Sequence, residues 1–240
     1  MSGPGAAART ALVSGASRGI GLAIVRAFVS EGIRVAMVAR GADELSMRAG
    51  ELGELAFPLP CDVGDIGAVQ RAASSARERF GGAPDILVNN AGFFFLATLD
   101  RTAPDALARL LDVNLLGAFS LVHTVLPAMR ERGSGHVVTI GSISDHIAFR
   151  QSGAYSMSKF ALRALHETLR AELRGSGVRT TLVSPAQVNT AIWDPVDPDS
   201  RPGFTPRHAM LSADAVAAAV VYAVTQPPAV NVDELRLSRA

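Results

Sequence analysis

The sequence predicts an α/β fold in which helices cover both faces of one parallel, doubly wound sheet of about seven strands. Two patterns predict this fold: short, almost continuously apolar runs, and longer amphipathic stretches between them. Strands buried on both faces must be apolar throughout. Strands separated by helices need right-handed crossovers, which build a parallel sheet. The chain has 240 residues, 48% of them hydrophobic, so we expect one domain with a substantial core.

The expected elements follow one another in a regular order. The strands are predicted at residues 11–14, 34–39, 56–60, 86–89, 136–140, 179–184 and 231–237. The helices are predicted at residues 21–30, 66–80, 104–131, 152–174 and 213–225. Residues 1–9 are small and polar and are expected to form a flexible N-terminal tail, which leaves residues 10–240 as one domain. Residues 191–211, rich in proline and aspartate, are expected to form a mobile substrate lid.

Composition excludes several classes of function. A net charge of +1 gives no field to draw the chain to nucleic acid or to an anionic membrane. The single cysteine, Cys61, rules out an intramolecular disulfide framework and fits a reducing compartment. No apolar run approaches the ~18 residues that span a bilayer, and no targeting signal is present. We therefore expect a cytoplasmic protein with no nucleic-acid partner, no membrane partner and no metal.

A glycine-rich turn follows the first expected strand and leads into a helix. Its sequence, Ser-Gly-Ala-Ser-Arg-Gly-Ile-Gly at residues 14–21, has the spacing Gly-x3-Gly-x-Gly. Glycines permit a tight turn and let backbone N–H groups approach a pyrophosphate, which then lies at the helix N-terminus. At the first strand–turn–helix of an alternating chain, this pattern indicates a Rossmann-type dinucleotide site.

The end of the second strand indicates which dinucleotide is bound. An NAD site would place an acid there to bind the adenosine ribose hydroxyls. Ala39 occupies that position, Arg40 follows it, and Arg18 in the phosphate turn can reach the same corner. Guanidinium groups suit a 2′-phosphate. The alternative is a pair of solvated arginines, and we favour NADP(H) over NAD(H).

The reacting group is predicted in the segment Tyr155-Ser-Met-Ser-Lys159. On a helix, Tyr155 and Lys159 are four residues apart and share one face. A carbonyl that receives hydride needs a proton donor at its oxygen, and a nearby ammonium should lower the pKa of a phenol. Such pairs are often unrelated helix residues. Here, however, Lys159 is the only lysine among 23 basic residues, which indicates a site where a guanidinium cannot serve.

Further motifs occur in a consistent order. They are Asn-Asn-Ala-Gly at residues 89–92, Asn114, Ser142 thirteen residues before Tyr155, and Ser184-Pro185. Together with the glycine turn and the Tyr-x3-Lys pair, they make the chain resemble the short-chain dehydrogenase/reductase family from Thr10 to the C-terminus. The resemblance implies an oxidoreductase that acts on CH–OH groups and transfers hydride between NADP(H) and a carbonyl or secondary alcohol.

The resemblance also implies roles for matching residues. Tyr155 would be the general acid, Ser142 would orient the substrate oxygen, Lys159 would bind the nicotinamide ribose, and Asn114 would hold a water of the proton relay. The implied cofactor-binding residues are Gly15, Ser17, Arg18, Gly19, Ile20, Gly21, Arg40, Asp62, Val63, Asn89, Ala91, Gly92, Tyr155, Lys159, Pro185, Val188 and Thr190. Asn89 and Asn90 could instead mainly tie strands together.

Some residues depart from the family pattern or lie beside it. Gly141 stands where a second serine often precedes the catalytic one. Ala186 stands where glycine is usual, which would strain the cofactor loop if that position needs a positive φ. Asp145 and His146 lie near the expected pocket, but the four implied catalytic residues already account for the proton.

The substrate is expected to be a small-molecule carbonyl or alcohol, bound by loops beyond the strand ends. Candidate pocket residues are Phe94, Ser144 and Trp193; the run of three phenylalanines at residues 93–95 is either a pocket wall or core packing. Helices with apolar residues on more than one face indicate a homo-oligomer, either a tetramer or a dimer. A hydroxy-acid or alcohol dehydrogenase working oxidatively, or a catalytically silent dinucleotide-binding regulator, remains an alternative.

Overall fold

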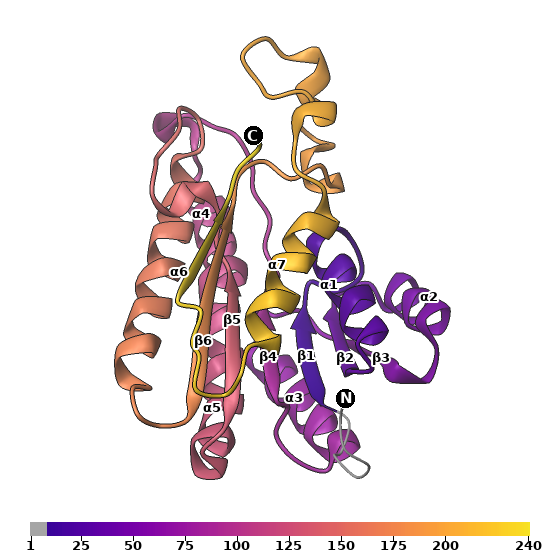
Figure 1. The fold of residues 1–240 in the computed structure, drawn as a ribbon. Coiled ribbons are helices and arrows are strands. Elements are labelled where there is room, and N and C mark those ends of the chain that lie inside the picture. The colour runs from indigo at the N-terminus through magenta and orange to yellow at the C-terminus, as the bar shows by residue number, and fades with distance from the viewer. Residues whose placement is uncertain (1–8) are drawn as a thin grey trace.

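A computed structural model describes residues 9–240 and contains one seven-stranded parallel sheet (Figure 1). The strand order is β3-β2-β1-β4-β5-β6-β7, with the order reversing between β1 and β4. The strands are β1 (Thr10–Ser14), β2 (Arg34–Ala39), β3 (Ala56–Pro60), β4 (Ile86–Asn89), β5 (Gly135–Ile140), β6 (Val178–Pro185) and β7 (Glu234–Leu237). A reversal of this kind opens a crevice at the carboxyl ends of the central strands.

Helices cover both faces of the sheet, as predicted. They are α1 (Gly19–Ser30), α2 (Ala42–Leu52), α3 (Ile66–Phe80), α4 (Pro104–Leu111), α5 (Gly117–Arg132), α6 (Gly153–Glu172) and α7 (Ala213–Thr225). Side chains of α1, α2 and α7 belong to one hydrophobic core, and side chains of α3, α5 and α6 belong to the other. Strand β1 is buried along its whole length and supplies both cores, Val13 to the first and Leu12 to the second. The strands are apolar at almost every position because both faces of the sheet are buried.

The structure differs from the sequence prediction at two helices. Helix α2 was not predicted, because only two of its residues, Leu45 and Ala49, are buried and its apolar pattern is correspondingly weak. The long helix expected at residues 104–131 is instead α4 and α5 joined by a π-helical segment, Asp112–Leu116. The stretch Pro104–Arg132, 29 residues in all, is long and apolar enough to cross a membrane by length and hydropathy alone, contrary to our expectation. Half of its apolar 18-residue window is, however, buried within the fold.

The two ends of the chain also differ from expectation. Strand β7 begins at Glu234 rather than at residue 231. The side-chain amide of Asn231 exchanges two hydrogen bonds of 3.0 Å with the backbone of Thr180, replacing the ladder that a strand residue would form. At the other end, Arg9 was expected in the flexible tail but donates to the Val224 carbonyl at 3.0 Å. Residues 1–8 of that expected tail lie outside the described part of the chain.

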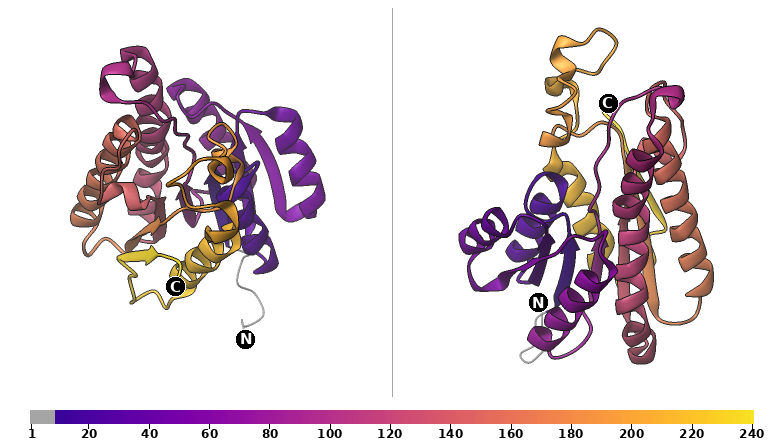
Figure 2. Two further views of the ribbon diagram at one scale, coloured as in Figure 1. Left: turned by 90° about the horizontal axis from the view of Figure 1, so that it is seen from above. Right: turned by 180° about the vertical axis from the view of Figure 1, so that it is seen from behind.

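The segment at residues 191–211 stands above the carboxyl ends of the strands, next to the start of α7 (Figure 2). It contains three 3-10 turns, Ala191–Trp193, Pro198–Ser200 and Arg207–Ala209, and no longer helix. Arg207 ties it together through bonds to the Asp194 carboxylate at 2.6 Å and the Thr190 carbonyl at 3.1 Å. The segment thus has the irregular structure that its composition predicted.

Candidate active site

The turn at residues 14–21 has glycine at the positions where a side chain would strain the backbone or overlap neighbouring atoms. Gly15 and Gly19 have φ values of +66° and +57°, which favour glycine. A Cβ on Gly21 would overlap the Gly15 carbonyl oxygen and would lie 2.6 Å from the Asn90 amide nitrogen. That amide donates to the carbonyls of Ser14 (2.9 Å) and Gly15 (3.2 Å). Gly21 therefore lies behind the turn as a spacer, and Asn90 holds the turn against β4.

The N-terminus of α1 is left open by its own sequence. The helix has no side-chain hydrogen bond at its N-cap, Arg18, and no acidic residue in its first turn. The first N–H groups of a helix lack partners within the helix and carry partial positive charge. This end of α1 opens into a cavity of about 1260 Å³ that is lined by Gly15, Ser17, Arg18, Gly19 and Ile20. It is suited to a phosphate group.

The cavity continues past the end of β2 to a corner with charged side chains. This corner is lined by Arg18, Arg40, Asp62 and Val63. Glu44 of α2 also lines it, and the sequence analysis missed this residue together with its helix. Asp62 is partly engaged already, because its carboxylate accepts from the Gly64 N–H at 3.0 Å. The two exposed guanidinium groups fit a phosphate at this corner. Two acids are nonetheless present, so the corner is less uniformly cationic than the sequence indicated.

At the other end of the cavity lie Ser142, Tyr155 and Lys159. The Ser142 hydroxyl accepts from the Ser144 N–H at 3.1 Å, which leaves its own hydrogen free to be donated. Lys159 is 5% exposed, and its ammonium donates to the Ile140 carbonyl at 2.9 Å. The same ammonium lies 5.7 Å from the centre of the Tyr155 ring. Helix α6 and the end of β5 thus bring the three side chains together.

The ionisation of Tyr155 does not follow the prediction from the Tyr-x3-Lys spacing. Burial raises the pKa of Tyr155 to about 12; the Ser142 hydroxyl lowers it and the Asp145 carboxylate raises it. Burial also lowers the pKa of Lys159 to about 8, against the opposing effect of Asp145. Burial sets the direction of the shift, and Lys159 is not among the groups that lower the pKa of Tyr155, so the ammonium does not make the phenol acidic.

Asn114 lies beside the cavity rather than in it, within the π-helical segment between α4 and α5. Its side-chain oxygen accepts from the Phe93 N–H, and its nitrogen donates to the Phe93 carbonyl and to the Ser158 hydroxyl, all at 3.0 Å. The amide is thus occupied in fixing the loop after β4 to α6. A π-helical segment displaces backbone carbonyls from their usual partners and is frequent at functional sites.

The open side of the cavity has an aromatic wall. The ring of Phe94 lies 5.6 Å from that of Tyr155 and 4.9 Å from that of Trp193, centre to centre. Trp193 is fixed by a 3.1 Å bond from its indole nitrogen to the Val188 carbonyl. Phe149, exposed by 42%, also lines the cavity. The backbone of the neighbouring Gln151 has a φ of +63°, an uncommon conformation for a residue other than glycine.

Most of the expected site residues line this one cavity. The exceptions are Gly21, Asn89 and Asn114. Asn89 is buried, its side-chain oxygen has no hydrogen-bond partner among the described residues, and its neighbour Asn90 lines the cavity in its place. Glu44 lines the pocket although the sequence analysis did not single it out, whereas Phe149, Arg150, Gln151 and Phe204 lie in loops after the strand ends, where the substrate pocket was expected. Ala186 has no positive φ, so the strain considered for that position is absent.

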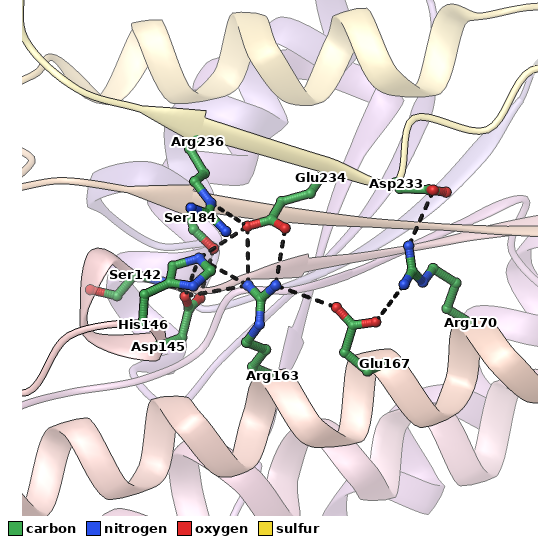
Figure 3. A network of polar contacts seen from close by, with 10 residues as sticks. All are labelled: Ser142, Asp145, His146, Arg163, Glu167, Arg170, Ser184, Asp233, Glu234 and Arg236. Carbon is green, nitrogen blue, oxygen red and sulfur yellow. Dashed lines mark hydrogen bonds and ion pairs between the residues drawn. The ribbon is translucent and has the colours of Figure 1, made fainter.

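Beside Ser142 lies a polar network that no motif predicted (Figure 3). The Asp145 carboxylate accepts from the Ser142 N–H at 3.1 Å and from the Ser184 hydroxyl at 2.6 Å. Arg163 of α6 makes two bonds of 3.0 Å to Glu234 of β7. His146 connects the two parts, with its Nε2 atom 3.0 Å from a carboxylate oxygen of each acid.

Comparison with known proteins places the chain in a family. Residues 9–201 match the family model described as short chain dehydrogenase. An uncharacterized oxidoreductase of Staphylococcus aureus (strain N315) is 34% identical over 228 residues, 95% of each chain. The alcohol dehydrogenase of the archaeon Thermococcus sibiricus, solved with 5-hydroxy-NADP, is 31% identical with a TM-score of 0.86, and the match covers 96% of both chains.

A third similar protein is a variant of actinorhodin polyketide ketoreductase, solved with NADPH. It is 29% identical with a TM-score of 0.88, and the match covers 96% of this chain and 95% of that chain. The family model covers most of the sequence, and the staphylococcal relative is matched over almost its whole length. The chain therefore belongs to the short-chain dehydrogenase/reductase family of oxidoreductases.

Proposed function

We propose that this protein is an NADP(H)-dependent reductase that converts an apolar ketone or aldehyde to an alcohol. The observation that carries the proposal is a single cavity that has the open phosphate turn at one end and Ser142, Tyr155 and Lys159 at the other. A nicotinamide dinucleotide needs contacts at both places. The two ends are parts of one site rather than of two pockets.

The residues present fit such a cofactor. A Cβ at Gly21 would overlap the Gly15 carbonyl oxygen and displace the turn, and the N-terminus of α1 offers uncapped N–H groups to a pyrophosphate. Arg18 and Arg40 would hold a 2′-phosphate, Asp62 and Val63 would contact the adenine, and Lys159 would contact the nicotinamide ribose. Ala91, Gly92, Pro185, Val188 and Thr190 line the groove between. When bound, the reduced cofactor supplies hydride to a carbonyl carbon.

The chain's own residues would supply the proton and orient the substrate. Ser142 donates its free hydroxyl hydrogen to the substrate oxygen. Tyr155, which the raised pKa keeps protonated, transfers its phenolic proton to that oxygen as negative charge develops there. The side-chain amide of Asn114 is occupied by Phe93 and Ser158, so its proposed role is to fix the loop after β4 against the helix that carries Tyr155.

The lining of the open side supports an apolar substrate. Phe94, Phe149 and Trp193 face it, and Ser144 contributes a hydroxyl near Ser142. The acids that line the cavity, Glu44 and Asp62, are both at the adenosine end. An aromatic or branched ketone would bury apolar surface there at about 25 cal/mol per Å². The segment at residues 191–211, which carries Trp193, would act as the lid.

The proposed reduction is tested with purified protein and a panel of ketones and aldehydes, following NADPH absorbance. Tyr155→Phe should abolish turnover while NADPH still binds, because the variant loses only the hydroxyl. Turnover that survives this change would refute the role of Tyr155. Binding of NADPH without turnover of any carbonyl or alcohol by the wild-type protein would favour the silent regulator instead.

The preference for NADP(H) has its own test. Arg40→Ala should weaken NADPH binding roughly tenfold or more and leave NADH binding nearly unchanged, because a charge-assisted hydrogen bond contributes about 1.5–3 kcal/mol. Glu51→Ala, at an exposed position of α2 outside the cavity, serves as the control. An equal effect of Arg40→Ala on both cofactors would show that the arginine does not read the 2′-phosphate.

We also propose that the protein is a homo-oligomer, a dimer or a tetramer. Apolar side chains exposed on α5 and α6 support this: Leu116 and Phe119 on or beside α5 are 47% and 49% exposed, and Met157 and Phe160 on α6 are both 44% exposed. Exposed apolar groups of this size favour an interface. Light scattering should give a mass of two or four chains, and Phe119→Ser with Phe160→Ser should lower it.

A further inference from the structure

Asp145 is the feature of this site that the proposed reaction does not use. It follows Ser142 by three residues, and its side chain is fully buried in the described structure. One carboxylate oxygen, Oδ2, accepts from the Ser142 N–H at 3.1 Å and from the Ser184 hydroxyl at 2.6 Å. The carboxylate thus fixes the backbone of Ser142.

The packing around Gly141 shows that the space is reserved for this carboxylate. A Cβ built on Gly141 would overlap Asp145 Oδ2 and would lie 2.8 Å from the Ser184 Oγ atom. A serine at position 141, the common family residue, could therefore not coexist with Asp145 in this arrangement. The departure at Gly141 and the acid at residue 145 are two parts of one local structure.

The second carboxylate oxygen of Asp145 connects the site to the outer network (Figure 3). Oδ1 accepts no aligned hydrogen bond among residues 9–240 but lies 3.0 Å from His146 Nε2 and 3.7 Å from an Arg163 nitrogen. Arg163 is in turn held by two bonds to Glu234. A buried carboxylate needs a partner, and Arg163 and His146 are the groups that lie next to this one.

The electrostatics of the catalytic pair support a role for this charge. Burial lowers the pKa of Lys159, and Asp145 is the charged group that opposes that effect. Asp145 also raises the pKa of Tyr155. One carboxylate therefore favours the ammonium over the free amine and the phenol over the phenolate, which are the states that a proton donor beside a bound ribose needs.

We propose that Asp145 is a positioning residue that holds Ser142 in place and supplies a buried negative charge that acts on Lys159 and Tyr155. His146, Arg163 and Glu234 hold Asp145 itself. The inference rests on the proposed function, but it concerns groups whose ionisation can be measured without any substrate.

Two substitutions separate position from charge. Asp145→Asn keeps an oxygen that can accept from the Ser142 N–H and removes the charge. Asp145→Ala removes both. Asp233→Asn is the matched control, because Asp233 belongs to the outer end of the same network, pairs with Arg170 at 3.1 Å and is 57% exposed.

The first readout is tyrosinate absorbance. Each of the wild-type, Asp145→Asn and Asp233→Asn proteins is titrated with and without Tyr155→Phe, so that the difference reports Tyr155 alone. We expect Tyr155 to ionise at lower pH in the Asp145→Asn protein and at unchanged pH in the Asp233→Asn protein. An unchanged titration in Asp145→Asn overturns the role of the charge, even if Tyr155→Phe abolishes turnover as the proposed function requires.

The second readout is steady-state kinetics with NADPH and the best carbonyl of the panel. Asp145→Ala should lower kcat by roughly tenfold or more, the effect of losing a charge-assisted hydrogen bond, with little change in the KM for NADPH. Asp145→Asn should recover most of kcat and move its pH profile. Circular dichroism confirms that each variant is folded, and Asp145→Asn decides the question if Asp145→Ala is not. Equal loss in both variants without a shifted pH profile overturns the positioning role.

Discussion

Ionisation of Tyr155 gives the sharpest test of the site, because the chain contains only two tyrosines. Burial raises the pKa of Tyr155 to about 12 in the ligand-free protein, from an ordinary value of 10.0. At pH 11, about one-tenth of a phenol with that pKa is ionised, whereas about nine-tenths of an unperturbed phenol would be. The protein is titrated to high pH, and the ionisation of tyrosine is followed by absorbance at a wavelength specific for tyrosinate.

Subtracting the Tyr155→Phe titration removes the contribution of Tyr222, which is present in both proteins. We expect the two curves to stay nearly together up to pH 11, over the range in which circular dichroism shows the native fold. A full extra tyrosinate in the wild-type protein by pH 11 would refute the dominance of burial. The raised pKa of Tyr155 keeps the phenol protonated through pH 9, whereas burial lowers the pKa of Lys159 to about 8. Reduction should therefore be nearly flat between pH 6 and 7 and should fall as the pH rises through 8, and oxidation should accelerate with rising pH.

Three other predictions follow from particular side chains. Gly21→Ala should weaken NADPH binding roughly tenfold to a hundredfold by calorimetry, because overpacking of the phosphate turn costs about 1–3 kcal/mol; Gly50→Ala, with no atom near its Cβ position, should bind NADPH normally. Burial lowers the pKa of His136 to about 3 and of His166 to about 4. The unfolded chain therefore takes up more protons below pH 6.5, and urea unfolding should show on the order of 5 kcal/mol less stability at pH 4.5 than at pH 7; a pH-independent stability would contradict this. Trp193 is the only tryptophan, so an aromatic ketone added to the NADP⁺-loaded protein should change its emission, and constant emission would place the substrate elsewhere.

The sequence predicted the sheet well because its strands are buried on two faces. Six of the seven predicted strands differ from the observed strands by no more than one residue at either end, and β7 is the exception. In β2 and β3 the bounds agree at both ends, because the apolar runs end at polar or proline-containing turns. Helix α2 was missed because two buried residues give too weak a period. Its first-turn acids, Asp43 and Glu44, and the glycine that ends it, Gly53 with a φ of +75°, were the available signals.

The network around Asp145 could not be predicted in the same way. Its members come from the turn after β5, from α6 and from β7, at positions 145, 163 and 234. No local period or motif relates these residues: Asp145 was noted only as lying near the expected pocket, and Arg163 and Glu234 alone look like ordinary surface charges. Only the sheet, which puts β6 and β7 next to each other, brings Glu234 to Arg163. Predicting the network therefore requires tertiary contacts that the sequence pattern does not contain.

Lys159 shows where the sequence argument was sound and where it stopped. Composition marked it as the one basic position where arginine had not been used, and the structure supplies a reason: the ammonium is buried and has the Ile140 carbonyl as its protein acceptor. A guanidinium has five N–H donors and keeps its charge, so most of its donors would be unsatisfied in this place. The spacing predicted that Lys159 lies near Tyr155, but it did not predict that both groups are removed from water. Since removal from water opposes charge on both groups, proximity alone could not predict which way either pKa would move.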